Sequence, residues 1–370
     1  MPKVAIFFHL GNHSLWPFFK GWIDNVYYAA NISMDLYVSY QDRSPVIDQI
    51  AAAYPATIFV ETKLGLDIGG KMALFAKAID KEYDYFLSIH TKSNPGWRND
   101  LITHTCITSD YVNTVMSWFQ NPTIGMIGAP NYLFPLDNLN HSLLEKLCSQ
   151  WGLTYRLDGS ITFVAGTIFW MRWSPLKRFF KEHRIDINAE YSKFEPGYFS
   201  NLKPTHTHSW ERMFGIINSH YGYKCYGSPP TTLTPSDFNP SYYGLCNPDL
   251  MAIDPSPPFL HSHWLNHGIY EGRPYRSRHV DRSNFDWQIY AVCNTDLARM
   301  DYTPQFLTTH WTNHGISECR PFRLVHIGIP GFDWQFYVSH YSDLTFMKSY
   351  EEAIRHFATF GRVEGRRCHR

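Results

Sequence analysis

The chain lacks a charge imbalance. Its 33 Lys and Arg residues equal its 33 Asp and Glu residues, so the formal net charge of the 370-residue protein is zero. A protein without net charge exerts no long-range attraction on nucleic acid or on an anionic membrane surface. We therefore expect no nucleic-acid partner, and any anionic ligand must be bound by a local cluster of side chains.

Paired cysteines and long apolar runs are also missing. The seven cysteines are odd in number, scattered in spacing and contain no Cys-x-x-Cys pair, so free thiols in a reducing compartment are the simplest interpretation. No stretch approaches the roughly 20 apolar residues that span a bilayer. The first residues, MPKVAIFFHLGN, lack the apolar region and cleavage site of a signal peptide. We expect a soluble, cytoplasmic protein with no transmembrane segment.

Aromatic residues are abundant, at 17% of the chain, which suits both a well-filled core and sugar-stacking surfaces. Strand-like and helix-like segments alternate over the first 130 residues. The expected strands are 4–10, 35–40, 57–61, 85–89 and 124–129, and the expected helices are 16–30, 45–54, 72–78 and 110–119. Further helices are expected at 138–151, 174–183 and 208–220, with a strand-turn-strand at 160–171. Such alternation predicts an α/β domain with a mostly parallel, covered sheet.

One stretch, 63–98, organises this domain. It begins with Gly65, Asp67, Gly69 and Gly70, a glycine-rich loop that permits positive φ angles and a close approach of the backbone to a ligand. After the helix and the buried strand come three polar residues, 90–92, with the sequence His-Thr-Lys. Ligands of open α/β sheets bind at the carboxyl ends of strands, so this stretch predicts a ligand site.

The C-terminal third contains an internal repeat. Phe238, Phe285 and Phe332 follow one another at intervals of 47 residues, and the units close with HWLNHGIYEGR, HWTNHGISECR and HFATFGRVEGR. Each unit is expected to form two short helices, the second ending at a helix-terminal glycine: Gly268, Gly315 or Gly361. The proline-rich GSPPTTLTP before the repeats indicates a linker. The predicted boundaries are a domain at 1–228, a linker at 229–236 and a small all-α repeat domain at 237–370.

The repeating Glu–Arg pairs of these units are expected to fix turns: Glu271 with Arg273, Glu318 with Arg320, and Glu364 with Arg366. A structural role of the repeats is favoured. An alternative is that they bind a glycan acceptor or mediate oligomerisation, because exposed Trp264 and Trp311 could stack on sugars.

Four motifs in order resemble the rhamnan-synthesis protein F family of glycosyltransferases. They are GLDIGG, YDYFLSIHTKSNPGWRNDL, AGTIFWMR and HSWERMF, and the resemblance covers about residues 4–226. It departs at Glu61-Thr62-Lys63-Leu64-Gly65, where the family has Glu-Asn-Arg-Gly, which puts the base or sugar specificity in doubt. The C-terminal units are similar to repeats that accompany bacterial and viral glycosyltransferases.

The resemblance implies a GT-A-like domain that transfers a sugar from a nucleotide diphosphate. Enzymes of this type usually neutralise the leaving diphosphate with a divalent metal held by Asp-x-Asp, but here His90-Thr91-Lys92 takes that place. Our hypothesis is a metal-independent enzyme in which Lys92 and His90 hold the diphosphate and Arg98 assists. The alternatives are a solvated Lys92, or a divalent metal such as Mn or Mg, for example on His90 with His206 and His208.

The resemblance also implies a general base, and Glu211, near the start of a late helix, fits that place. Its structural alternative is a first-turn glutamate that is favoured by the helix dipole and paired with an arginine. Asp67 is expected beside the nucleotide base or ribose, with a loop-capping role as the alternative. His9 is expected in the nucleoside pocket, with a core histidine as the alternative.

The remaining expected substrate-binding residues come from the same motifs. Residues 166–170 are predicted to form the floor under donor and acceptor, although Phe169 and Trp170 fit a plain core equally well. The other candidates in the substrate-binding set are Gly69, Thr91, Trp97, Gly166, Thr167, Trp170 and His208. The expected reaction is an inverting transfer of L-rhamnose or another deoxyhexose from a dTDP-, UDP- or GDP-linked donor to a glycan. A non-catalytic glycan-binding or scaffold protein that keeps the fold is the competing hypothesis.

Overall fold

The computed structural model describes residues 1–30, 32–197, 204–228, 234–235, 237–283, 285–323, 332–361 and 364–369. Its contacts divide the chain into two compact units. The first, called the α/β unit here, holds residues 1–235 and 269–272, and the second, called the repeat unit, holds 236–268 and 273–370. The predicted linker at 229–236 lies outside the described residues except for 234–235.

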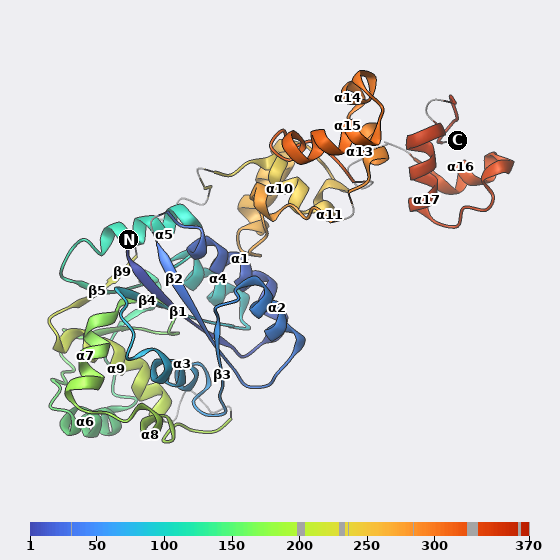
Figure 1. The fold of residues 1–370 in the computed structure, drawn as a ribbon. Coiled ribbons are helices and arrows are strands. Elements are labelled where there is room, and N and C mark those ends of the chain that lie inside the picture. The colour runs from blue at the N-terminus through green and yellow to red at the C-terminus, as the bar shows by residue number, and fades with distance from the viewer. Residues whose placement is uncertain are drawn as a thin grey trace. The chain divides into compact units, whose positions relative to one another are not determined.

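A seven-stranded sheet forms the centre of the α/β unit (Figure 1). Its spatial order is β3-β2-β1-β4-β8-β5-β9. The strands are β1 (Lys3–Leu10), β2 (Ser33–Tyr40), β3 (Ile58–Glu61), β4 (Tyr85–His90), β5 (Ile124–Gly128), β8 (Phe169–Arg172) and β9 (Lys224–Gly227). Only β8 runs antiparallel to its neighbours β4 and β5, while the other pairs are parallel. The predicted α/β class, with a mostly parallel sheet, is confirmed.

Helices pack on both faces of this sheet. They are α1 (Trp16–Tyr27), α2 (Pro45–Ala53), α3 (Leu66–Ala78), α4 (Pro95–Thr103), α5 (Ser109–Trp118), α6 (His141–Gln150), α7 (Trp173–Glu182), α8 (Ile187–Tyr191) and α9 (His206–His220). Successive side chains of a strand point to opposite faces. Accordingly, Phe7 contacts Phe75 of α3, whereas its neighbour Phe8 stacks on Phe19 of α1. Both faces of β1 are therefore buried, as its continuous apolar sequence predicts.

The strand-turn-strand predicted at 160–171 divides between two sheets. Its first strand, β7 (Thr162–Val164), pairs with β6 (Leu133–Pro135), while β8 pairs within the main sheet. The turn between them, 165–168, therefore crosses from one sheet to the other. Most of the predicted helices and strands end within a few residues of the observed ones, but α3 begins at Leu66 rather than at residue 72, and β6, β9, α4 and α8 were not predicted.

The repeat unit contains three successive groups of short helices. They are α10 (Pro240–Cys246), α11 (Pro248–Met251) and α12 (Pro257–His263); α13 (Trp287–Cys293), α14 (Thr295–Met300) and α15 (Pro304–His310); and α16 (Trp334–His340) and α17 (Tyr350–His356). Each group ends in a π-helical turn, at Trp264–Gly268, Trp311–Gly315 and Phe357–Gly361. The expectation of two helices per unit is therefore too simple, since the first two groups each have three.

The same polar contacts occur in each group of the repeat unit. A tyrosine hydroxyl meets a histidine Nδ1 at 2.9, 3.0 and 2.9 Å, in the pairs Tyr243–His263, Tyr290–His310 and Tyr337–His356. An arginine pairs with an aspartate at 2.7, 2.8 and 2.8 Å, in the pairs Arg273–Asp249, Arg320–Asp296 and Arg366–Asp343. Glu318 and Glu364 contact the arginines two residues later, as the turn prediction requires.

The three glycines near the repeat ends serve close packing. A Cβ atom at Gly268, Gly315 or Gly361 would lie 2.0, 2.7 or 2.3 Å from the hydroxyl oxygen of the tyrosine in its own group. The left-handed backbone conformation occurs four residues later, at Gly272, Cys319 and Gly365. The helical turns of the three groups end at Gly268, Gly315 and Gly361, as predicted.

The suggestion that exposed tryptophans of the repeats stack on sugars is also wrong. Trp264 and Trp311 are only 2% and 5% exposed. Their rings stack on Phe238 and Phe285 inside their own groups, so they belong to the core of the repeat unit. Among the helices of the described residues, none is long and apolar enough to cross a membrane.

Candidate functional site

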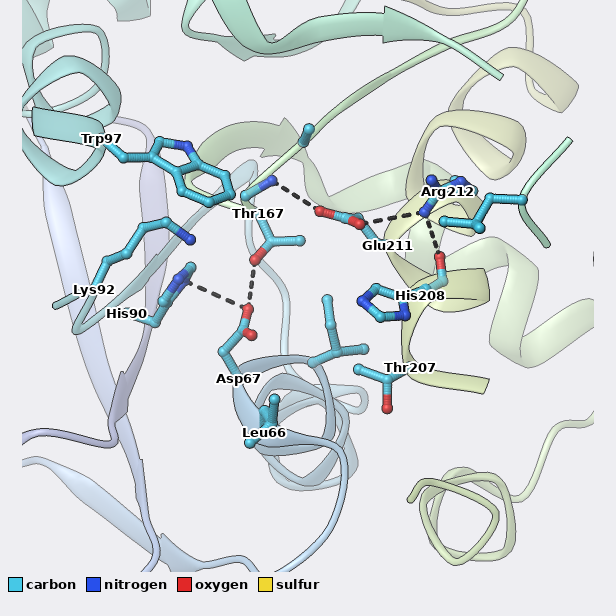
Figure 2. Close-up of a pocket in the computed structure, with 14 residues that line it drawn as sticks. Leu66, Asp67, His90, Lys92, Trp97, Thr167, Thr207, His208, Glu211 and Arg212 are labelled. Carbon is cyan, nitrogen blue, oxygen red and sulfur yellow. Dashed lines mark hydrogen bonds and ion pairs between the residues drawn. The ribbon is translucent and has the colours of Figure 1, made fainter. Parts of the chain in front are cut away.

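A cavity of about 370 Å³ opens at the carboxyl end of β4. It lies between β4, the start of α3, the 165–168 turn and α9. Figure 2 shows His90, Lys92 and Trp97 on one side and His208, Glu211 and Arg212 of α9 on the other. The lining residues are Leu66, Asp67, Ile68, His90, Lys92, Trp97, Leu139, Ala165, Gly166, Thr167, Thr207, His208, Glu211 and Arg212.

Asp67 lies at one wall of the cavity and is held by three groups. Its Oδ2 lies 2.6 Å from Nζ of Lys71 and 3.4 Å from Nδ1 of His90, and it accepts a hydrogen bond from the hydroxyl of Thr167. Burial would raise the pKa of Asp67, but the neighbouring His90 and Lys71 and the two hydrogen bonds outweigh it and hold that pKa well below its usual value. Asp67 is therefore a carboxylate, and its Oδ1 has no hydrogen-bond partner among the described residues.

Lys71 completes this wall from below and is completely buried. Its ammonium contacts Asp67 and donates to the Thr167 hydroxyl at 2.7 Å. Burial lowers the pKa of Lys71, and the adjacent carboxylate of Asp67 opposes that shift. Sequence reasoning did not name Lys71, although its spacing of four residues from Asp67 places the two side chains on one face of a helix.

The glycine pattern before this wall has a different role from the predicted one. Helix α3 already begins at Leu66, and of the three glycines only Gly65, with φ of 69°, has a left-handed backbone, followed by Leu66 with φ of 51°. Gly69 and Gly70 are helical. A Cβ atom would lie 1.9 Å from the Leu64 carbonyl oxygen at Gly69 and 2.4 Å from Nδ1 of His9 at Gly70. These glycines permit packing of α3 on the strands, and Gly69 does not line the cavity.

His90 and Lys92 reach the cavity, as the sequence predicted. Burial lowers the pKa of His90 to about 3, so this imidazole is neutral at pH 7. The Lys92 ammonium lies 3.2 Å from the ring centroid of Trp97. Burial lowers the pKa of Lys92, while Asp67 and Glu211 oppose the shift from a distance. Lys92 forms no ion pair with a carboxylate in the described part of the chain.

Three other predicted residues lie next to the cavity without lining it. Thr91 accepts hydrogen bonds from the backbone N–H groups of Gly11 and Asn12 at 2.9 and 2.8 Å. Arg98 is buried and donates to the Lys92 carbonyl oxygen at 3.3 Å. His9 is buried against Ser39, with 3.0 Å between Nδ1 and Oγ, and burial lowers its pKa to about 4. The His9 contact matches the core-histidine alternative, while Thr91 and Arg98 contact backbone atoms.

The 165–168 turn supplies Gly166 and Thr167 to the cavity. Both have left-handed backbones, with φ of 79° and 51°. A positive φ is unusual for a β-branched residue, so Thr167 is a strained position. Trp170, two residues into the following strand, is completely buried and donates to the Thr105 carbonyl oxygen. Trp170 is thus a core residue, whereas Gly166 and Thr167 line the cavity.

Helix α9 forms the opposite wall. Thr205 caps its start, and Glu211 lies in the second turn, so the description of Glu211 as a first-turn glutamate was wrong. Oε1 of Glu211 accepts a hydrogen bond from the Gly166 N–H at 2.8 Å, and Oε2 lies 3.3 Å from Arg212. Burial raises the pKa of Glu211, although the Gly166 N–H and Arg212 oppose the shift.

Arg212 links this wall to a residue that sequence reasoning missed. Its guanidinium makes two contacts with Asp137, at 2.6 and 3.1 Å, and donates to the His208 carbonyl oxygen at 3.0 Å. A two-point arginine–carboxylate pair fixes orientation as well as charge. Nothing in the sequence pattern connects Asp137 with Arg212, because they are 75 residues apart and Asp137 belongs to an irregular segment.

The three-histidine metal site that was considered as an alternative does not form. His206 contacts Glu190 at 2.7 Å, and His208 contacts the Thr205 hydroxyl at 2.8 Å. In the described ranges, no group of three or more His, Cys, Asp or Glu side chains is placed to hold a metal ion. The seven cysteines are free thiols.

Comparisons with known proteins give only weak structural likenesses. No protein-family model and no curated protein sequence matches the chain. A mannosyltransferase from Pyrobaculum calidifontis, solved with GDP-mannose and Mn²⁺, is 13% identical with a TM-score of 0.32 and 86% of each chain covered. A 4-diphosphocytidyl-2C-methyl-D-erythritol synthase is 9% identical with a TM-score of 0.27, covering 58% of this chain and 97% of the other. Likenesses this weak carry neither activity over to this chain.

Proposed function

We propose that this protein is a glycosyltransferase that uses a nucleotide-diphosphate sugar. The proposal combines the four family motifs with the cavity at the carboxyl end of β4. Residues from all four of these motifs line the cavity: Asp67, His90, Gly166 and Glu211. In an open α/β sheet this is the edge at which nucleotides bind.

The observation that carries the proposal is that Lys92 has no carboxylate partner among the described residues. Of the described lysines and arginines that line the cavity, the other one, Arg212, contacts the carboxylate of Asp137, and the buried Lys71 behind the wall contacts Asp67. Lys92 instead lies on the face of Trp97. A cation on an aromatic ring gains about 0.5–2 kcal/mol, whereas a hydrogen bond to a charged group gains about 1.5–3 kcal/mol. Lys92 is therefore available to a phosphate, which would hold it more strongly than the indole does.

This ammonium supplies the charge that a leaving diphosphate needs. In the proposed reaction the acceptor hydroxyl oxygen forms a bond to the anomeric carbon while the bond from that carbon to the phosphate oxygen breaks. The electron pair leaves with the diphosphate, and Lys92 stabilises the charge that develops there. Arg98 supports Lys92 by donating to the carbonyl oxygen of Lys92, and the neutral His90 lines the same cavity as Lys92. We propose that the enzyme needs no metal, with dependence on Mn or Mg as the alternative.

Glu211 is the proposed general base for this inverting transfer. It lines the same cavity as Lys92, and its raised pKa favours acceptance of the acceptor's proton near neutral pH. We propose L-rhamnose or another deoxyhexose as the sugar, with dTDP, UDP or GDP as the nucleotide, because the motifs resemble rhamnan-synthesis enzymes. A glycan acceptor and a cytoplasmic location belong to the same proposal.

A thermal-shift screen tests this function. The protein is heated with UDP, GDP and dTDP and their sugars, each with Mn²⁺ and with EDTA. A ligand at 100 times its Kd should stabilise the fold by about 2.7 kcal/mol. We expect one nucleotide to stabilise the wild type in EDTA but not Lys92→Met, whereas Lys146→Met, at an exposed lysine, should behave as the wild type. Stabilisation only with Mn²⁺ would overturn metal independence, and no stabilisation would favour a glycan-binding scaffold.

A further inference from the structure

The strained residue Thr167 is held on both its side chain and its main chain. Its hydroxyl accepts a hydrogen bond from Lys71 and donates one to Asp67, and its carbonyl oxygen accepts one from the buried Ser88 hydroxyl at 2.6 Å. A residue held in a sparsely populated conformation is strained and persists only where its surroundings determine that conformation. Three hydrogen bonds with residues of β4 and α3 hold Thr167 in this conformation.

The fixed 165–168 turn also contacts Glu211 on the opposite wall of the cavity. Gly166 directly precedes Thr167, and its N–H donates to Oε1 of Glu211 at 2.8 Å. Figure 2 shows this connection, which runs from Asp67 through Thr167 and the 166–167 backbone to Glu211. The buried ion pair on one wall is thus joined to the carboxylate on the opposite wall. The residues involved are far apart in sequence, so the connection exists only in the folded protein.

We propose that Thr167 is a positioning residue that holds the Gly166 N–H against Glu211 and so fixes the orientation of this carboxylate in the cavity. Arg212 contacts the other oxygen of Glu211 at the longer distance of 3.3 Å and is itself held by Asp137. Glu211 is therefore fixed at Oε1 by the turn, while Oε2 is the more weakly held oxygen and is the one that would receive a proton. The functional consequence rests on the proposed role of Glu211 as base.

Substitutions at Thr167 separate positioning from general support of the fold. Thr167→Val keeps the shape and loses the two side-chain hydrogen bonds, and Thr167→Gly also removes the backbone strain if the valine variant folds poorly. Thr167→Ser keeps the hydroxyl. We expect kcat to fall on the order of 100-fold in the valine and glycine variants, because small misplacements of a catalytic group have effects of this size. The serine variant should keep most of the activity, and nucleotide binding should change less than kcat.

Thr62→Val is the matched control. The Thr62 hydroxyl is buried in the same unit and has no hydrogen-bond partner among the described residues, so the same chemical change removes no contact seen there. Equal kcat in Thr167→Val and Thr62→Val would overturn the proposal. A loss of kcat in Thr167→Val that is matched by an equal loss of nucleotide affinity at every pH would also overturn it, because Thr167 would then support binding alone.

A second readout does not depend on the proposed function. The protonation of Glu211 can be followed by ¹³C NMR of labelled glutamate carboxyls, with its signal identified by its absence in Glu211→Gln. Loss of a fixed N–H donor disfavours the carboxylate, so the titration midpoint should rise in Thr167→Val but not in Thr167→Ser or Thr62→Val. An unchanged midpoint would overturn the positioning role. A raised midpoint in a protein that binds no nucleotide would leave that role intact and contradict the proposed function instead.

Discussion

The two units use polar contacts in opposite ways. In the repeat unit the tyrosine–histidine and arginine–aspartate contacts join residues 19–24 positions apart and recur in each group. In the α/β unit several contacts at the cavity join residues 45–100 positions apart and occur once, as in the pairs of Thr167 with Asp67 and Gly166 with Glu211. Contacts that recur locally determine a fold, whereas distant residues that converge at one cavity indicate a site.

The largest expected difference between the units concerns their ion pairs. Lys71→Met leaves Asp67 with a partly buried charge and should lower the local free energy of unfolding by about 3–5 kcal/mol, because removal of one partner of a buried pair leaves an uncompensated charge. Arg320→Met removes a solvent-exposed pair and should lower it by about 1 kcal/mol or less. Hydrogen exchange by mass spectrometry reports α3 and α13–α15 separately. Equal losses in the two variants would remove the distinction between the units.

Acid should affect the α/β unit through its buried histidines. The pKa of His9 in the folded protein is about 4, below the 6.5 of the unfolded chain, so the unfolded state binds more protons between these values. The free energy of unfolding should therefore decrease as the pH falls through this window, by about 3 kcal/mol for His9 at 1.36 kcal/mol per pH unit. Urea unfolding at several pH values measures this slope. His9→Asn should flatten it, and an unchanged slope would contradict the assignment.

The repeat glycines allow a graded test of close packing. Gly268→Ala, Gly361→Ala and Gly315→Ala would bring a methyl group to 2.0, 2.3 and 2.7 Å from a tyrosine hydroxyl oxygen. Overpacking of this kind typically costs about 1–3 kcal/mol. We expect the losses of stability, measured by hydrogen exchange of each group, to follow the order 268, 361, 315. Three equal losses would show that helix propensity, rather than the tyrosine contact, sets the cost.

The smallest expected effect is a gain in stability at Cys319. Its left-handed backbone, with φ of 54°, occupies the place of Gly272 and Gly365 in the neighbouring groups. Cys319→Gly should relieve part of the roughly 1–2 kcal/mol that this conformation costs a residue with a Cβ, with a net gain below about 1 kcal/mol. Gly365→Ala should lose stability, although no atom lies within 4 Å of the added Cβ. Thermal unfolding of both variants tests whether Cys319→Gly gains stability and Gly365→Ala loses it.

Much of the α/β unit could be predicted from its sequence, because apolar runs of strand length alternate with helical spacing. Helix α4 was not predicted, although the sequence carries signals for its start. Asn94 caps this helix and Pro95 occupies its first turn, and both are helix-start signals. The exposure of Trp264 and Trp311 was misjudged because their partners Phe238 and Phe285 precede them by 26 residues.

The site could be predicted in part. The run from His90 to Lys92 follows a strand, and alternate side chains of an extended chain point in opposite directions. His90 and Lys92 accordingly reach the cavity, while Thr91 contacts Gly11 and Asn12 on the other side. Contacts between distant segments left no pattern in the sequence, so Asp137 and the connection from Thr167 to Glu211 emerged only from the fold.

The measurement that tests the account most directly is release of nucleoside diphosphate from the sugar nucleotide that stabilises the protein, in EDTA. Wild type is compared with Glu211→Gln and Lys92→Met at equal folded fraction. The account predicts that Glu211→Gln still binds the donor but releases nucleoside diphosphate far more slowly, and that Lys92→Met loses both binding and release. Release at the wild-type rate in both variants would contradict the assignment of this cavity as the active site.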